Sequence, residues 1–449
     1  MRAHIITTTY ENSIIETITE TPAFFSDASH RELYLVNLYP EIKYQTIDGF
    51  GGAITESVGV VLQALPNALA DKIIESYFGQ EGIGYTLVRT HLDSCDFSTE
   101  NYSAVESADD PHLNTFSLVH DEKNIIPYIQ SASKAAGKDI DVMLSPWSPP
   151  AFMKTNADKN GGGKLKPEYY ALWAKYICKY ILAYRAKGIN VTMFSVQNEP
   201  KAVQTWDSCV FSAEEEHDFL QKFLYPELLK NGLQDMGVYI WDHNKERLYD
   251  RAKAVIDSFT STIIEGVAFH WYSGDHFDAV RLVREQFPDK KLLFSEGCIE
   301  YSHLDKTQQL QHAQMYAHDM IGNLNVGLNT FIDWNIVLDI QGGPNHVQNF
   351  CEAPIMCDTV NYSIEKKLSF YYIMHFSKYI KPQARHIATT CYSPKLEVTA
   401  FENPDKSIVV IMLNRTSEDQ PAFIRLYGEL LNITGRKESI STLIIDKSE

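Results

Sequence analysis

Two glutamates stand where apolar, strand-like runs of the sequence end. Glu199 closes FSVQNEP, and Pro200 after it blocks further ladder pairing and fixes a turn. Glu296 closes LLFSEGC, where Gly297 gives the backbone room to turn. Two carboxyl groups on either side of one bond can carry out glycoside hydrolysis, because one acid protonates the leaving oxygen and an ionised partner faces the anomeric carbon.

The distance between two such groups decides the stereochemistry of the reaction. About 5–5.5 Å makes the partner a nucleophile and gives retention, whereas about 6.5–9.5 Å admits a water and gives inversion. Glu199 and Glu296 end the fourth and the seventh of eight strand-like runs. If the eight strands close into a ring, the ends of strands four and seven face each other across it, which favours the shorter distance. Either glutamate alone would be interpreted as a structural carboxylate at a strand end, with its hydrogen bonds satisfied by its neighbours. The joint placement of Glu199 and Glu296 favours a catalytic pair instead.

Other polar and aromatic residues follow the remaining apolar runs. They are Asp96, Trp147, Asn198, His270-Trp271-Tyr272 and Asp333-Trp334-Asn335. Asn198 can hydrogen-bond a sugar 2-hydroxyl, or it can simply cap the turn. Trp147 and Trp334 lie beside loop signals, which favours a sugar platform over core packing. His270 can orient the nucleophile or a sugar hydroxyl, and a structural histidine is nearly as good an interpretation.

The histidines do not show the spacing of a zinc site. His243, His270 and His276 lack close ligand spacing, so no metal is expected. No cofactor is implied either, because acid–base chemistry and a covalent glycosyl intermediate need only two glutamates.

Residues 41–385 alternate apolar β-branched runs with amphipathic helical stretches, and such a pattern predicts a (β/α)8 barrel of the α/β class. Helices are expected within Tyr169–Lys187 and Ala213–Lys230. The predicted strands are Gln45–Gly51, Thr86–His91, Asp141–Ser145, Val191–Val196, Val238–Trp241, Gly266–His270, Lys291–Phe294 and Gly327–Ile332.

The two ends of the chain show strand patterns without a long helix. Leu396, Val398 and Ala400 alternate with Glu397 and Thr399, as in a strand with one buried face. Residues 1–40 and 386–449 are therefore expected to join as one attached β-sandwich, since the termini of a domain often lie close together.

Charge and composition exclude several classes of partner. A formal net charge of -18 repels phosphate backbones and anionic lipid, so nucleic acid is a poor candidate. No run of 18 or more apolar residues predicts a membrane span. The N-terminus does not resemble a secretory signal, and the seven cysteines are odd in number and scattered. Cytoplasmic residence and a small-molecule glycoside substrate are expected, and the oligomeric state stays open.

Seven motifs occur in a fixed order along the chain. They are IDGFGGAITES (47–57), SCDFS (94–98), SPWSPPAFMKTN (145–156), SVQNEP (195–200), FHWY (269–272), FSEG (294–297) and DWNIVLDIQGGPN (333–345). Together they closely resemble glycoside hydrolase family 30, and its glucosylceramidase branch, with its link to sphingolipid metabolism, fits best. The resemblance implies a retaining β-glycosidase with a β-sandwich formed by both termini.

The resemblance also implies roles for individual residues. Glu199 would be the acid/base and Glu296 the nucleophile, and Tyr272 would hydrogen-bond the nucleophile region. The residues expected to contact the nonreducing sugar are Asp96, Trp147, Asn198 and Trp334, with Asn345 nearby.

Departures from the branch pattern leave the substrate open. His346 follows GGPN where the pattern is aromatic, and Phe152 replaces a Trp-like residue after SPP, both near the expected aglycone side. A β-glucosidase is favoured because Asp96 can bind several hydroxyls of a six-carbon sugar and close off a longer chain. A β-xylosidase, β-fucosidase or β-1,6-glucanase of the same family remains an alternative, and a non-catalytic carbohydrate-binding protein is a further one.

Overall fold

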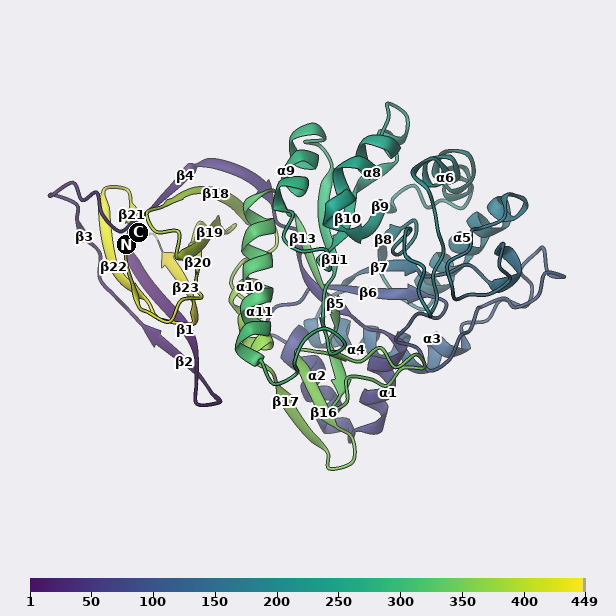
Figure 1. Cartoon of the computed structure of the whole chain (residues 1–449), viewed down its shortest axis with the longest axis horizontal. Helices are drawn as coiled ribbons and strands as arrows, with labels where there is room; N and C mark the ends of the chain where they lie inside the picture. Colours follow the sequence, from purple (N-terminus) through teal and green to yellow (C-terminus); the bar gives the residue numbers. More distant parts are fainter. Residues whose placement is uncertain (447–449) are drawn as a thin grey trace.

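The computed structural model describes residues 1–446, and at its centre eight parallel strands close into a barrel (Figure 1). The ring order is β10-β11-β13-β5-β6-β7-β8-β9. The strands are β5 (Gly49–Ala53), β6 (Leu87–Leu92), β7 (Asp141–Pro146), β8 (Val191–Ser195), β9 (Gly237–Asn244), β10 (Ile264–His270), β11 (Lys291–Glu296) and β13 (Thr330–Asn335). Each predicted strand overlaps one of them, and the predicted fold class is confirmed.

Helices surround the barrel. They are α1 (Glu56–Ala64), α2 (Asn67–Phe78), α3 (Val119–Asn124), α4 (Ile126–Ala136), α5 (Tyr170–Ala186), α6 (Ala213–Phe219), α7 (Tyr225–Lys230), α8 (Leu248–Val255), α9 (Phe277–Gln286), α10 (Gln309–Asn325) and α11 (Leu368–Ser377). A wide π turn over Leu220–Leu224 joins α6 to α7. Pro226 follows that turn, and a proline has no amide to donate to the carbonyl one helical turn earlier, which favours the wider turn.

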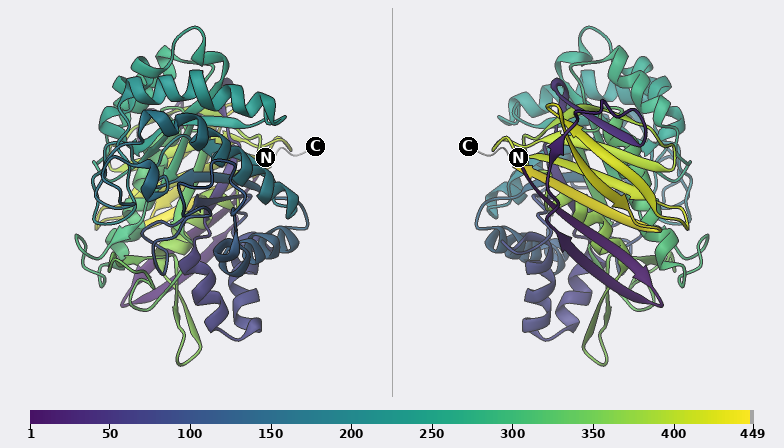
Figure 2. Two further views of the ribbon diagram at one scale, coloured as in Figure 1. Left: turned by 90° about the vertical axis from the view of Figure 1, so that its right-hand side faces the viewer. Right: turned by 90° about the vertical axis from the view of Figure 1, so that its left-hand side faces the viewer.

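Both ends of the chain contribute to one ten-stranded sheet beside the barrel, with the order β2-β1-β23-β20-β19-β18-β4-β21-β22-β3 (Figure 2, right). Its strands are β1 (Arg2–Glu11), β2 (Ile14–Glu20), β3 (Phe25–Ser26), β4 (Leu35–Thr46), β18 (Arg385–Cys391), β19 (Leu396–Glu402), β20 (Ile408–Asn414), β21 (Gln420–Leu426), β22 (Glu429–Gly435) and β23 (Ser439–Asp446). They enclose an apolar core of their own that includes Val36, Ile424 and Leu443.

The second face of this sheet packs on the barrel helices. Leu396, Val398 and Ala400 point into the sheet's own core, as their alternation predicts. Thr399, on the opposite face, is fully buried rather than solvated, because β19 packs there against α10. The sandwich is therefore attached to the barrel through a continuous buried interface.

Short strands extend from the mouth of the barrel. β12 (Ile299–Glu300) pairs with β15 (Cys351–Glu352), and β14 (Val337–Asp339), β16 (Ile355–Asp358) and β17 (Ser363–Lys366) form a small sheet. Within residues 1–446 no helix has both the length and the apolar character that a membrane crossing needs.

The inside of the barrel changes character along its axis. At one level it is apolar, with Leu87, Met143, Tyr239, Ala268, Leu293 and Ile332 in contact. Toward the carboxyl ends of the strands, buried polar side chains replace them, including Arg89, Ser145, Ser195, Asp242 and Ser295. Active sites of such barrels lie at the carboxyl ends of the strands, so this polar layer supports the site from below.

Candidate active site

A fully buried arginine on β6 organises the floor of the site. Arg89 donates from Nη1 to Glu296 Oε2 at 2.6 Å and from Nη2 to both Asn198 Oδ1 at 2.8 Å and Asp242 Oδ2 at 2.9 Å. Its Nε donates to Ser145 Oγ at 3.1 Å. Burial of a guanidinium is tolerated only where carboxylates and hydrogen bonds offset its desolvation, and all of these are present.

Glu296, the last residue of β11, is held from two sides. Arg89 donates to Oε2, and the Tyr272 hydroxyl donates to Oε1 at 3.1 Å. The same hydroxyl lies 3.4 Å from Cys298 Sγ, so Tyr272 is fixed between the two side chains. A carboxylate with a cation on one oxygen and a hydroxyl donor on the other is fixed in position, as a nucleophile requires.

Glu199 lies on the turn after β8 and has a left-handed backbone, with φ of 45°. Its amide donates to the Asp242 carbonyl at 2.9 Å, and the neighbouring Asn198 amide donates to the Pro146 carbonyl at 2.8 Å. These two bonds fasten the turn to β7 and β9. Trp241 and Asp242 on β9 are also left-handed, and such strained backbone is concentrated at functional sites.

His270 connects the two glutamates. Its Nδ1 lies 3.1 Å from Glu199 Oε1 and 3.9 Å from Glu296 Oε1, and its Nε2 lies 3.1 Å from Asp242 Oδ1. A shared neighbour at these distances brings the two carboxyl groups together across the mouth of the barrel. The predicted pair therefore meets, and the arrangement is compatible with the roughly 5–5.5 Å separation of retaining enzymes.

The charges around His270 set the protonation states. Burial alone would lower the pKa of His270, but Glu296, Asp242 and Glu199 outweigh it and raise that pKa to about 9. Burial would raise the pKa of Glu199, but His243 and His270 outweigh it and hold that pKa well below its usual range. The directions of both pKa shifts favour a proton on His270 rather than on Glu199.

A cavity of about 490 Å³ opens above this layer. Asp96, Trp147, Asn198, Glu199, Tyr272, Glu296 and Trp334 all line it, so the structure brings together seven of the nine predicted site residues. His270 lies behind Glu199 and is fully buried. Asn345 is also outside the lining, and its Oδ1 accepts from the Val347 and Asn349 amides. Asn345 therefore shapes the loop that carries Val347, Gln348 and Asn349 to the rim.

Asp96 lines the cavity beside the rim residue Asn349. Asn349 Nδ2 donates to Asp96 Oδ2 at 3.0 Å, whereas the buried Oδ1 of Asp96 has no hydrogen-bond partner. Burial, with Glu296 nearby, raises the pKa of Asp96 to about 8. An unpartnered buried oxygen that lines a cavity fits a ligand hydroxyl, since leaving it unpaired costs about 1–3 kcal/mol.

The two tryptophans pack as a pair beside the cavity. Trp147 and Trp334 stack with their ring centroids 5.4 Å apart, and the Arg89 guanidinium lies 4.8 and 5.5 Å from the two rings. Only 3% of Trp147 and 2% of Trp334 is exposed. Core packing and a place beside the sugar are therefore not exclusive for these two tryptophans, because the same rings pack in the core, cover Arg89 and line the cavity.

Several site residues were missed by the sequence reasoning. These are Arg89, Asp242 and His243, and the rim residues Gln204, Trp206, Asn244 and Asn349. A signal existed for Arg89, because a charge inside the apolar run LVRTHL needs buried partners. No local signal marks Gln204, Trp206 and Asn349, which lie on loops, or Asn244, which ends β9.

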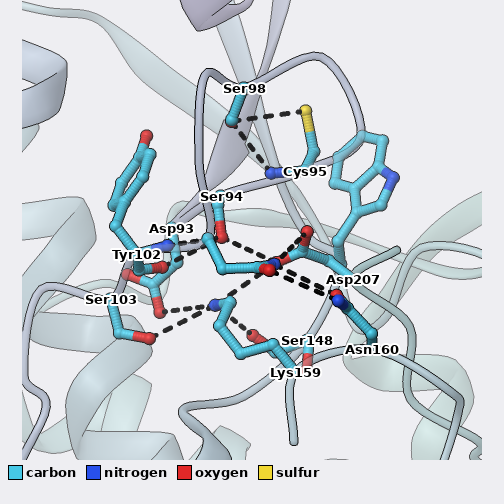
Figure 3. A network of polar contacts seen from close by, with 12 residues as sticks. Asp93, Ser94, Cys95, Ser98, Tyr102, Ser103, Ser148, Lys159, Asn160 and Asp207 are labelled. Atoms are coloured by element: carbon cyan, nitrogen blue, oxygen red, sulfur yellow. Dashed lines mark hydrogen bonds and ion pairs between the residues drawn. The ribbon is translucent and has the colours of Figure 1, made fainter. Parts of the chain in front are cut away.

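A buried lysine ties three of these loops together (Figure 3). Lys159 Nζ lies 3.8 Å from Asp93 Oδ2 and 3.6 Å from Asp207 Oδ1, and it donates to Ser103 Oγ at 3.2 Å. Ser94 Oγ donates to the same Asp207 oxygen at 2.6 Å. The loops after β6, β7 and β8 are thereby joined at the base of the cavity wall that carries Asp96 and Trp206.

Replacing this lysine should destabilise the protein. In Lys159→Met two buried carboxylates lose their cation, and removing one partner of a buried ion pair costs about 3–5 kcal/mol. Denaturant unfolding should show a loss of that size, with a smaller loss for Lys164→Met, whose partner Glu215 is solvent-accessible. Equal, small losses for both variants would contradict the network's structural role.

Two family models match the chain. Residues 47–380 match the glycosyl hydrolase family 30 TIM-barrel domain, and residues 383–443 match the glycosyl hydrolase family 30 β-sandwich domain. Among curated proteins, lysosomal acid glucosylceramidase of Mus musculus is 33% identical over 407 residues, which cover 87% of this chain and 79% of that protein.

Solved structures agree over the whole chain. SrfJ from Salmonella typhimurium is 40% identical with a TM-score of 0.94, and an endo-β1,6-glucanase is 26% identical with a TM-score of 0.89. Both alignments cover 100% of each chain. The likeness therefore includes the barrel, the sandwich and the loops at the mouth.

Proposed function

This chain belongs to glycosyl hydrolase family 30 and is a β-glycosidase, and we propose that it removes a terminal β-D-glucosyl unit with retention, using Glu199 as acid/base and Glu296 as nucleophile. One observation carries the assignment of roles. Glu296 is held by Arg89 and Tyr272, whereas Glu199 is paired with an imidazole that can supply a proton.

The first step breaks the glycosidic bond. Glu296 attacks the anomeric carbon while Glu199 gives its proton to the leaving oxygen, which departs as an alcohol. Before this step the proton has to pass from His270 Nδ1 to Glu199 Oε1, across 3.1 Å. Asp242, on the other ring nitrogen, keeps His270 in the orientation that allows the transfer.

The second step returns the enzyme to its starting state. Glu199, now ionised, takes a proton from water while the water oxygen attacks the anomeric carbon, and the bond between that carbon and the Glu296 carboxylate breaks. The sugar leaves with its original β configuration and Glu296 is released as a carboxylate. The proton returns to the Glu199–His270 pair.

The proton on this pair should set the alkaline limit of activity. The pKa of His270 is raised to about 9, so the pair keeps its proton at neutral pH and loses it as pH rises through that value. We expect kcat/KM to fall above about pH 9, and to fall at lower pH in His270→Gln, where Glu199 alone holds the proton. Profiles on an aryl glycoside measure this, and Asp96→Asn identifies any contribution from Asp96, whose pKa is about 8. An unchanged alkaline limb in His270→Gln would contradict the shared proton.

A single terminal sugar is the unit expected to bind at the Asp96 side of the cavity. Asp96 offers its unpartnered oxygen there, and Asn349 covers the carboxyl group from the rim loop. Sequence likeness to curated glucosylceramidases favours a glucosyl unit. A panel of aryl β-glucoside, β-xyloside, β-fucoside and β-galactoside tests the choice, and equal rates on glucoside and xyloside would undercut it. Turnover of β-1,6-glucan with none of the aryl glycosides would favour a glucanase instead.

Asp96 should discriminate between the sugars of that panel. The pKa of Asp96 is raised to about 8, so at neutral pH its hydrogen bonds are those of a neutral group, worth about 0.5–1.5 kcal/mol each. Asp96→Asn should therefore lower kcat/KM on the glucoside at pH 7 by roughly 2- to 10-fold. A xyloside lacks the exocyclic hydroxymethyl group and should lose less. Equal losses on both sugars would show that Asp96 does not recognise that group.

We also propose that the protein acts in a reducing compartment such as the cytoplasm. All seven cysteines are free thiols, and six of them are buried. Unpaired cysteines are typical of proteins in reducing surroundings.

A further inference from the structure

We propose that Glu199, His243 and His270 form a binding site for a first-row transition-metal ion such as Zn²⁺, and that the bound ion inhibits hydrolysis. Each residue offers one ligand atom, and these atoms lie within 4.8 Å of one another. The three residues come from different parts of the chain, on β9, on β10 and after β8. The inhibitory half of the proposal rests on the role proposed for Glu199, whereas the binding half does not.

The distances match the edges of a metal coordination shell. Glu199 Oε1 lies 3.1 Å from His270 Nδ1 and 3.4 Å from His243 Nδ1. Ligands placed tetrahedrally at zinc bond lengths of about 2.0–2.1 Å are separated by about 3.3 Å. Two of the three ligand–ligand edges therefore already have the length that an ion requires.

His270 is oriented as a metal-binding histidine. Its Nδ1 faces Glu199, and its Nε2 lies 3.1 Å from Asp242 Oδ1. Histidine ligands usually donate their second N–H to a carboxylate, which fixes the ring and strengthens the ligand. Binding an ion at Nδ1 needs only the loss of that nitrogen's proton to solvent, as metal binding to histidine generally does.

His243 supplies the observation that points to a missing ligand. Its Nδ1 is buried and has no hydrogen-bond partner, because its approach to Glu199 at 3.4 Å does not form a hydrogen bond. The ring packs against Trp241 with centroids 5.1 Å apart. A buried nitrogen of this kind requires an explanation, and a coordinated ion would satisfy it.

The donor set and the surrounding charge indicate which ions fit. Two imidazole nitrogens and one carboxylate suit Zn²⁺, Ni²⁺ or Cu²⁺, whereas Mg²⁺ and Ca²⁺ prefer oxygen ligands. Glu199, Glu296 and Asp242 lie at the site and outnumber the neighbouring cation Arg89, so they can offset the charge of the ion. The cavity in front of Glu199 and His243 leaves a fourth position for water.

Inhibition follows from the ligand that the ion takes. A metal bound to Glu199 Oε1 occupies the lone pair that must carry the catalytic proton. The ion therefore blocks acid catalysis without unfolding the protein or filling the sugar end of the cavity at Asp96.

The test uses the metal-free full chain and two readouts that do not need turnover. Calorimetric titration with Zn²⁺ should reveal one site, and Co²⁺ should give the visible absorption of a low-symmetry nitrogen–oxygen site. His243→Leu and Glu199→Gln should each weaken Zn²⁺ binding by about 100-fold or more. His303→Leu is the matched control, because His303 lines the same cavity outside the cluster and its loss should leave Zn²⁺ affinity unchanged.

The same titration followed by activity completes the test. The inhibition constant of Zn²⁺ for the unmodified protein should equal the dissociation constant measured by calorimetry, and a chelator should restore activity. No Zn²⁺ binding, or binding that neither His243→Leu nor Glu199→Gln weakens, would overturn the site. Binding at this site without inhibition would overturn the inhibitory half and contradict the role of Glu199, so the two failures are distinguishable.

Discussion

Glu296→Gln should reduce hydrolysis of every accepted glycoside by on the order of 10⁵-fold, a loss comparable to that of other nucleophile knockouts. The amide is nearly isosteric with the carboxylate, so the fold and the cavity should persist. It cannot form the glycosyl ester, because a neutral amide is a poor nucleophile. Steady-state kinetics with an aryl β-glucoside measure the effect.

Glu300→Gln is the matched control for this loss. Glu300 also lines the cavity, but none of the hydrogen bonds or ion pairs in residues 1–446 joins its side chain to Arg89 or Tyr272. Its replacement should cost far less than that of Glu296. Similar losses of activity in the two variants would contradict the assignment of Glu296. A circular dichroism spectrum of Glu296→Gln that differs from that of the unmodified protein would attribute the loss to altered structure.

Glu199→Gln should lose about 10²- to 10⁴-fold in kcat/KM on substrates with a poor leaving group, because general acid catalysis is worth that much. The loss should shrink for an aryl leaving group that departs without protonation. Glycosylation then continues and the glycosyl–Glu296 ester accumulates, since no base activates water. A pre-steady-state burst of released phenol should reveal the accumulation.

Glu199→Ala gives a sharper version of the same test. The space left by the carboxyl group should admit azide, which needs no general base and should restore turnover as the β-glycosyl azide. His270→Gln should not be restored in this way, because Glu199 remains in place. An equal loss on good and poor leaving groups, with no azide rescue, would show that Glu199 is not the acid/base.

Much of the fold follows from patterns that are local in the sequence. The helix from Tyr170 to Ala186 buries Trp173, Tyr176, Ile177 and Tyr180, whose three- and four-residue steps predict one buried face. The eight barrel strands were likewise detectable as apolar runs. The burial of Thr399 was not predicted, although its face of the strand was, because the packing of β19 against α10 is a long-range contact with no local signal.

The site likewise has features that local sequence patterns predict and features that they do not. Glu199 and Glu296 were predictable because each ends a strand, and strand ends meet at one side of the barrel. The proton arrangement was not predictable, since it depends on His270 lying between Glu199 and Asp242. The histidine spacing likewise gave no metal signal, yet the fold brings His243 and His270 to one glutamate while His276 stands just before α9.

The rim of the cavity shows the limit of reasoning from residue types. Asn345 was expected near the sugar, and it instead organises the loop that presents Asn349 to Asp96. The loop contacts that create this arrangement join residues about 250 positions apart in the chain, and only the folded structure specifies them.

Covalent trapping of the nucleophile tests the central claim most directly. A 2-deoxy-2-fluoro-β-glucoside with a good leaving group should form an ester that hydrolyses slowly, because the fluorine destabilises the oxocarbenium-like transition state. Mass spectrometry of the intact protein and of its peptides should find one added fluoroglucosyl group, on Glu296. A label on another residue, or no label while the hydrolysis product has inverted configuration, would contradict the retaining mechanism with Glu296 as its nucleophile.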